Sequence, residues 1–219
     1  MLYLYAFSQS PTTLPQTVGL EDAPLSVETL DGIEAVVSAF EGSAIQASEE
    51  SVLAHARVIE QLAARNEAVV PAQFGRAFDD SGSLEDAVRD REAELRDAIE
   101  RVRGCVELGL RVLAPVDESA PAPASGREYM LGRLEQSRRD ESDADELHAP
   151  LAALAREATR SLRATPQLLL SAAYLLPRGD VERFREAVRS QQEAHPDLSF
   201  VCTGPWPPYS FATAGGDAT

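Results

Sequence analysis

Apolar residues near the start of the chain have the spacing and composition of strands. Residues Leu2–Phe7 are apolar and rich in aromatic side chains, which is typical of a strand that packs against a core. Two further apolar runs, Leu25–Leu30 and Ile33–Phe40, flank Asp31 and Gly32. An Asp-Gly pair between two such runs is a common hairpin turn. We therefore expect three strands, of which the second and third form a hairpin.

Two later segments of the first half have the apolar spacing of helices. Residues Ser48–Arg65 start with a good N-cap, and their apolar positions recur every three or four residues. Residues Ser83–Arg103 continue the same spacing, although Arg91 interrupts the apolar stripe, and Gly104 is a suitable C-cap. The sequence therefore predicts two helices, each beginning at a serine.

The second half alternates between strand and helix patterns. Pro150 removes a helical hydrogen bond, so we expect a kink or a fresh helix start at that point. The order of elements favours an α+β or α/β layer fold with helices on one face of a small sheet. The expected elements are strands at Cys105–Leu113, Leu168–Leu176 and Leu198–Cys202, a long helix over Arg127–Arg163 and a helix that begins at Asp180.

The length and the element order indicate two domains. A chain of 219 residues is long enough for one or two domains. We place the boundary near Arg103 and Gly104, which gives an N-terminal α+β domain at 1–103 and a C-terminal domain at 104–211. The small, polar residues 212–219 predict a disordered tail.

The charge of the chain narrows the classes of partner. The sequence has 20 basic residues, all of them arginine, against 36 acidic ones, and its net charge is −16. Such a charge argues against nonspecific binding to nucleic acid and against anionic membrane surfaces. No apolar run is long enough for a membrane helix, and the apolar N-terminus is expected to be a strand rather than a signal peptide.

The histidines and cysteines, which could bind a metal or take part in catalysis, are far apart in the sequence. His55, His148 and His195 lie far from one another and from Cys105 and Cys202, so we expect no metal site and no cofactor. The sequence contains no glycine-rich phosphate loop and no nucleophile-elbow motif. We predict that His55 is a buried core histidine, with a functional role as the alternative, and that both cysteines are buried, reduced thiols. No catalytic residue is predicted.

An unusual aromatic segment lies close to the C-terminus. Gly204 is followed by three prolines that surround the only tryptophan and precede a tyrosine: Pro205, Trp206, Pro207, Pro208 and Tyr209. Prolines fix the backbone and lower the entropic cost of holding the rings in place. Two interpretations are open. The segment is either a clamp that lays Trp206 and Tyr209 over its own domain, which we favour, or an anchor that presents these rings to a partner.

This segment closely resembles the C-terminal signature of the gas vesicle protein family GvpF/GvpL. Further blocks resemble the same family, and together they extend over nearly the whole chain: His55–Leu62, Val70–Phe78, Cys105–Val112, Gly126–Leu131 and Ala173–Pro177. The combination is specific, whereas any single block is weak. The candidate interaction or structural residues of the Val70–Phe78 block are Pro71, Phe74, Gly75, Arg76 and Phe78. We expect Phe74 to pack in the core of the first domain.

The resemblance implies a fold and a function. It implies two α+β domains, the second a modified ferredoxin-like fold with a long helix. It also implies an accessory or minor structural protein of gas vesicle formation that binds the hydrophobic shell protein during assembly. Its partners would be this shell protein and other accessory proteins, its place the gas vesicle in the cytoplasm, and it would not be an enzyme. The alternative is an enzyme or a small-molecule-binding regulator on a ferredoxin-like scaffold.

Overall fold

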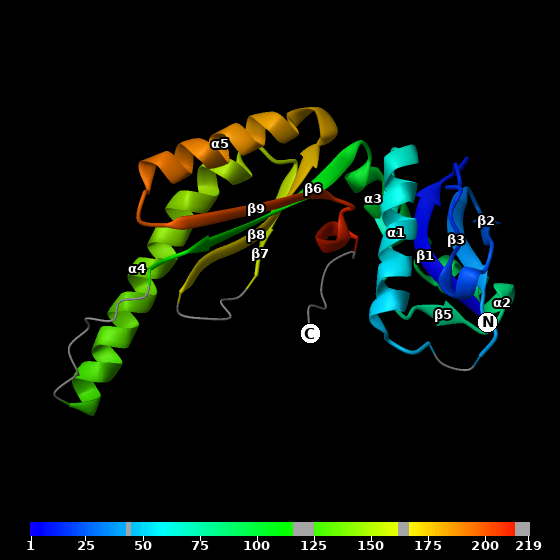
Figure 1. The fold of residues 1–219 in the computed structure, drawn as a ribbon, viewed down its shortest axis with the longest axis horizontal. Helices are drawn as coiled ribbons and strands as arrows, with labels where there is room; N and C mark the ends of the chain where they lie inside the picture. The colour runs from blue at the N-terminus through cyan, green and yellow to red at the C-terminus, as the bar shows by residue number, and fades with distance from the viewer. Residues whose placement is uncertain (43–44, 116–124, 162–166, 213–219) are drawn as a thin grey trace. The chain divides into compact units, whose positions relative to one another are not determined.

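The computed structural model describes residues 1–42, 45–115, 125–161 and 167–212. The chain forms two compact units: Met1–Val106 together with the chain from Trp206 onward, and Glu107–Pro205 (Figure 1). The C-terminal segment therefore belongs with the first unit, whereas the sequence had placed it in the second domain. Residues 162 and 163 of the predicted long helix and the predicted tail from 213 onward lie outside the described residues.

The first unit is built on an antiparallel sheet with the strand order β2-β3-β1-β4, and β5 also pairs with β1. The predicted hairpin is confirmed, because Leu30 pairs with Ile33 across Asp31 and Gly32. Both turn residues have positive φ angles, 50° and 84°, as a type I′ turn requires. The strands are β1 (Leu2–Gln9), β2 (Leu25–Leu30), β3 (Ile33–Ala39), β4 (Val69–Pro71) and β5 (Ala77–Phe78).

The helices of the first unit are α1 (Glu49–Arg65), α2 (Ser81–Asp90) and α3 (Glu92–Val102). Ser48 caps α1 as predicted, and its side chain forms a capping box with Ser51. The single helix predicted at Ser83–Arg103 is wrong, because the backbone leaves helical geometry at Arg91. The N-cap of α2 is Asp80, whose side chain accepts a hydrogen bond from the Ser83 N–H.

Aromatic side chains of β1 occupy the centre of the first core. Tyr3 and Tyr5 are fully buried, and their rings meet edge to face with centroids 4.8 Å apart. Helix α1 contributes the apolar face that the sequence predicted. The other buried members of this cluster are Ala6, Leu20, Val36, Phe40, Val58, Ile59, Leu62, Ala63 and Val69.

The second unit has a four-stranded sheet in the order β7-β8-β6-β9. Helices α4 and α5 pack on the same face of this sheet, since Leu147 and Leu151 of α4 join Phe184 and Val188 of α5 in one core. The predicted α+β class is confirmed, while the ferredoxin-like description stays a prediction. The elements are β6 (Cys105–Leu113), α4 (Gly126–Ala152), β7 (Glu157–Arg160), β8 (Leu168–Pro177), α5 (Val181–Ala194) and β9 (Ser199–Trp206).

Helix α4 is shorter than the sequence predicts. It ends at Ala152 rather than near residue 163, and a strand that the sequence missed, β7, pairs antiparallel with β8. Pro150 lies inside α4, so no new helix starts there. The part of α4 that packs on the core is its C-terminal part, where Leu147 and Leu151 are buried.

Candidate functional site

The C-terminal segment turns back onto the first unit. After β9 a short 3-10 helix, η3 (Tyr209–Phe211), contacts α3 and β4. Phe211 is only 2% exposed, and Pro207 and Pro208 are also buried. The segment is therefore held by Phe211 and the two prolines. Phe211 ends the same aromatic segment of the sequence but is not among its candidate residues, although its place as the last large apolar residue of the chain is a usable signal.

The rings that were predicted to form the clamp are partly exposed. Trp206 is 46% exposed and Tyr209 is 41% exposed. The clamp interpretation stays a prediction for these two residues, whose side chains are each partly covered, whereas the neighbouring prolines and Phe211 take fully buried positions. Exposed aromatic rings on a backbone fixed by buried prolines have the geometry of a presented contact surface.

The second predicted motif connects β4 to β5. Pro71 is buried in β4, where it pairs with Ala6 of β1. Gly75 has a φ of 87°, a conformation that favours glycine, and its N–H donates a hydrogen bond to the Tyr3 hydroxyl at 3.2 Å. The guanidinium of Arg76 lies over the Phe78 ring, 5.1 Å from its centroid.

Phe74 lies at the edge of the core. Its side chain is half-buried, and its ring meets the rings of Tyr3 and His55 edge to face at 6.3 and 5.6 Å. One side of Phe74 therefore packs on the core, as expected, while the other side reaches the surface. The short helix η3, which contains Tyr209, contacts β4, where the Val70–Phe78 block begins. The two predicted motifs therefore meet at β4.

A network of hydrogen bonds buries His55. The His55 ring is 4% exposed, its Nδ1 lies 2.7 Å from the Tyr3 Oη, and its Nε2 lies 3.2 Å from the Ala72 carbonyl oxygen. Burial lowers the pKa of His55, so its neutral form is favoured. Burial likewise raises the pKa of Tyr3 to about 12, the Gly75 N–H lowers it, and nearby tyrosines raise it. The predicted core histidine is confirmed.

The remaining candidates for chemistry stay apart. Cys105 is buried, Cys202 is half-buried, and neither forms a disulfide. His148 is half-buried, and its Nδ1 lies 2.9 Å from the Tyr174 hydroxyl. Over the described ranges, no three His, Cys, Asp or Glu side chains are grouped so that they could hold a metal ion. No helix within those ranges has the length and apolarity to cross a membrane.

Residues 1–213 match the family described as gas vesicle synthesis protein GvpL/GvpF. The chain belongs to this GvpL/GvpF family, and its role is in gas vesicle formation.

Relatives and solved structures agree with this assignment. Gas vesicle protein F2 of Halobacterium salinarum is 32% identical over 181 residues, which cover 82% of this chain and 76% of the relative. The crystal structure of GvpF from Anabaena sp. PCC7120 has a TM-score of 0.81 at 22% identity and covers 100% of this chain and 98% of its own. GvpF from Microcystis aeruginosa gives the same TM-score and identity, with 97% and 99% covered. These structures show the fold.

Proposed function

We propose that this protein binds the hydrophobic shell protein of the gas vesicle during assembly, and that it works with other accessory proteins at the gas vesicle in the cytoplasm. It acts by contact rather than by catalysis. Membership of the GvpL/GvpF family supports the setting. The exposed ring of Trp206, on a segment held by buried neighbours, is the observation that carries the contact.

The physical need for such a contact follows from the partner. A strongly hydrophobic shell subunit tends to aggregate before it assembles. A protein with a net charge of −16 keeps a complex in solution through like-charge repulsion between complexes. The contact itself requires apolar area, which Phe74, Trp206 and Tyr209 supply; we call these three residues the aromatic surface.

The rigidity of the aromatic surface favours binding. Pro207 and Pro208 restrict the backbone between the two exposed rings, and Phe211 fixes the end of the segment in the core. Little conformational entropy remains to be lost when a partner covers Trp206 and Tyr209. Tryptophan and tyrosine are also the side chains that most often dominate the energy of protein interfaces.

The test is co-production of this protein with the shell protein, followed by retention on an affinity resin at moderate salt. Trp206→Ala is expected to weaken retention by about tenfold or more, the usual effect of losing a tryptophan hot spot. Val201→Ala is the matched control, because Val201 lies in the same strand and is equally exposed. Both variants are compared well below their melting temperatures, because Trp206 also has a buried half.

The fluorescence of Trp206 gives a second readout, since it is the only tryptophan. Its emission is expected to move to shorter wavelength when the shell protein is added, because the partner removes water from the ring. The proposal fails if wild-type protein does not retain the shell protein. The proposed role of the aromatic surface is contradicted if the Trp206→Ala variant retains as much shell protein as the Val201→Ala variant.

A further inference from the structure

A groove of about 940 Å³ lies in the first unit between the first half of α1 and a short 3-10 helix, η1 (Leu20–Asp22). It shares no residue with the aromatic surface, and the sequence motifs did not point to it. Residues on the described parts of the connection between β3 and α1, 40–42 and 45–48, form its third side. Its lining combines Val18, Gly19, Leu20, Glu21, Asp22, Phe40, Glu41, Gly42, Ile45, Gln46, Ser48, Glu49, Glu50, Ser51, Leu53, Ala54 and Arg57.

Apolar side chains form part of the lining of the groove. Leu20 and Phe40 are buried and belong to the core of the unit. Ile45 and Ala54 are half-buried, and Leu53 is 53% exposed. Leu53 lines the groove, so it offers apolar area that no other described side chain covers. Exposed apolar area inside a groove with a polar rim is typical of a binding surface.

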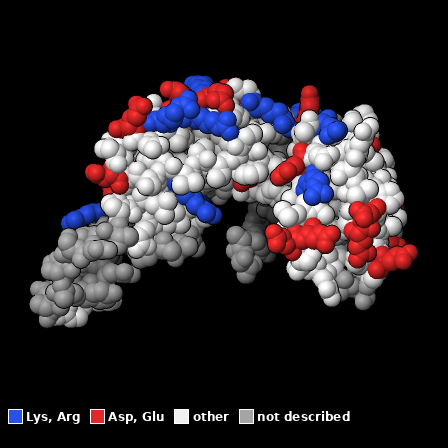
Figure 2. Space-filling view, viewed as in Figure 1, with Lys and Arg blue, Asp and Glu red and all other residues white. Residues whose placement is uncertain are grey.

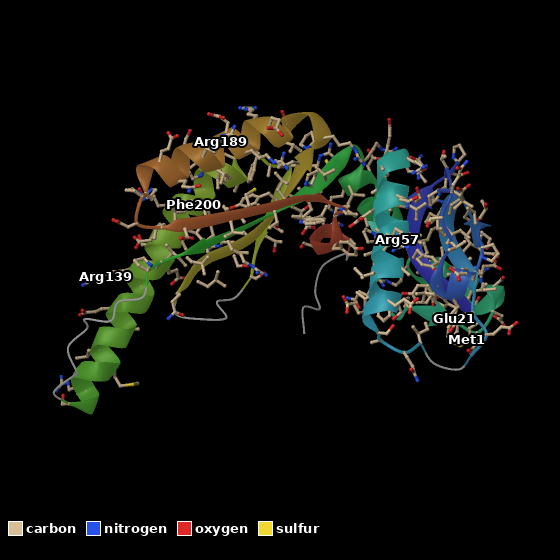
Figure 3. The ribbon with its side chains drawn as sticks, viewed as in Figure 1. Met1, Glu21, Arg57, Arg139, Arg189 and Phe200 are labelled. Atoms are coloured by element: carbon tan, nitrogen blue, oxygen red, sulfur yellow. The ribbon has the colours of Figure 1, made fainter. Side chains whose placement is uncertain are left out.

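The rim of the groove is acidic. Five carboxylates line it against a single cation, Arg57, and within the described ranges none of the five makes an ion pair: Glu21, Asp22, Glu41, Glu49 and Glu50. Figure 2 shows acidic side chains gathered on this part of the unit, and Figure 3 labels Glu21 and Arg57 on it. The helix dipole accounts for Glu49 and Glu50, which lie in the first turn of α1. It does not account for Glu21, Asp22 and Glu41.

A buried tyrosine hydroxyl holds the η1 wall of the groove in place. The Leu20 N–H donates a hydrogen bond of 2.7 Å to the Tyr5 hydroxyl, which also lies 3.0 Å from Ser38 Oγ. A Cβ at Gly19 would lie 2.2 Å from this hydroxyl oxygen, so only glycine fits there. These contacts hold the η1 wall of the groove in place without a partner, which lowers the cost of binding there.

We infer that this groove binds an amphipathic helix of a partner protein, with apolar side chains in one row and arginine or lysine beside them. The apolar row would cover Leu53, Ile45 and Ala54, as in other helix-in-groove interfaces. The flanking cations would meet the carboxylates of the rim in charge-assisted hydrogen bonds. Nucleic acid and anionic lipid carry the same sign of charge as the rim and are repelled. This inference does not depend on the shell protein.

The first test uses three synthetic peptides of about 18 residues, which is five helical turns. One peptide places leucines on one face with arginines beside them, a second has the same composition in shuffled order, and a third replaces arginine by glutamate. Calorimetric titration of the wild-type protein is expected to show the first binding at least about tenfold more tightly than the second. The third is expected not to bind.

Two pairs of variants locate the binding. Leu53→Ser is expected to lower the affinity for the first peptide about tenfold. Val52→Ser is expected to change this affinity by no more than about twofold, because Val52 is also exposed on α1 but does not line the groove. The double variant Asp22→Asn with Glu41→Gln is expected to lower the affinity for the first peptide by a similar factor and to make this affinity depend less on salt. Glu60→Gln with Asp97→Asn removes the same charge from exposed positions outside the groove and is expected to change little.

The outcomes distinguish specific binding in the groove from nonspecific electrostatic attraction of a basic peptide to an acidic protein. Equal weakening by the two charge variants, or equal binding of the ordered and shuffled peptides, would overturn the inference. So would the absence of binding at a peptide concentration of about 1 mM. Circular dichroism and melting temperature of each variant show that it is folded. Because these titrations do not use the shell protein, their result is independent of whether this protein retains the shell protein.

Discussion

Acidification is expected to destabilise the first unit through His55. The Ala72 carbonyl oxygen can only accept a hydrogen bond, so Nε2 carries the ring proton and donates it. The Tyr3 hydroxyl accepts the Gly75 N–H and directs its own proton to Nδ1 of His55. A second proton on this ring would place two donors face to face inside the core. The charged form of His55 therefore has no good partner there.

The direction of the effect follows from linkage. Burial lowers the pKa of His55 in the folded protein below its usual value of 6.5. The unfolded chain takes up the proton first, so the stabilising contribution is complete above pH 6.5 and is lost as the pH falls toward the lower folded value. For one such group, the free energy of unfolding falls by at most about 1 kcal/mol between pH 6.5 and pH 5.5, which is the limit when the folded protein takes up no proton in that range.

Urea unfolding between pH 7.5 and about 5.5 measures this contribution, and the range stays above the titration of ordinary carboxylates. The emission of Trp206 reports the first unit, to which this residue belongs. In His55→Gln the amide can accept a hydrogen bond from Tyr3 and donate one to Ala72 but does not titrate, so the pH dependence of its unfolding free energy is expected to be smaller than that of the wild type. An unchanged slope in His55→Gln, or a wild type that gains stability on acidification, would refute the reasoning.

Two further predictions concern the residues that hold the motifs. Phe211→Ala is expected to lower the free energy of unfolding by about 3–5 kcal/mol and the melting temperature by about 6–20 °C. Phe211→Leu should lose less than half as much stability. An unaffected melting curve would contradict the buried position of this ring. Gly75→Ala is expected to cost about 1–2 kcal/mol by thermal melting because of its φ of 87°, whereas Gly82→Ala in α2 should be neutral or stabilising. Equal effects of the two alanines would contradict the backbone argument.

Local signals in the sequence predicted the elements that depend on few residues. The Asp31-Gly32 turn and the Ser48 cap appear where the pattern places them, because turn and cap chemistry is decided within a few positions. The break at Arg91 was visible as an interruption of the apolar stripe but was not interpreted as a break. A continuous helix would direct this guanidinium into the core, whereas the break leaves it exposed and bonded to Glu94 at 2.8 Å.

Tertiary pairing decided the features that the sequence missed. Residues Glu157–Arg160 continue the helical spacing of the preceding segment, yet they form the edge strand β7 because β8 offers backbone partners. The same limit applies to the aromatic segment. Its composition showed that the rings were unusual, but only the packing of η3 on α3 and β4 shows that Phe211 is buried and Trp206 is exposed.

Charge and apolar area contribute to binding in different ways at the aromatic surface and at the acidic groove. At physiological ionic strength the field of a charge is screened within about 8 Å, so the net charge of −16 acts on the approach of a basic partner more than on the finished complex. The lasting contact also needs apolar area that is already exposed, which Trp206 and Leu53 provide at separate places, beside the hydrogen bonds that the carboxylates at the groove would make. Added salt should therefore slow the association of a basic partner at the groove more than it speeds dissociation, while the contact at Trp206 should depend little on salt.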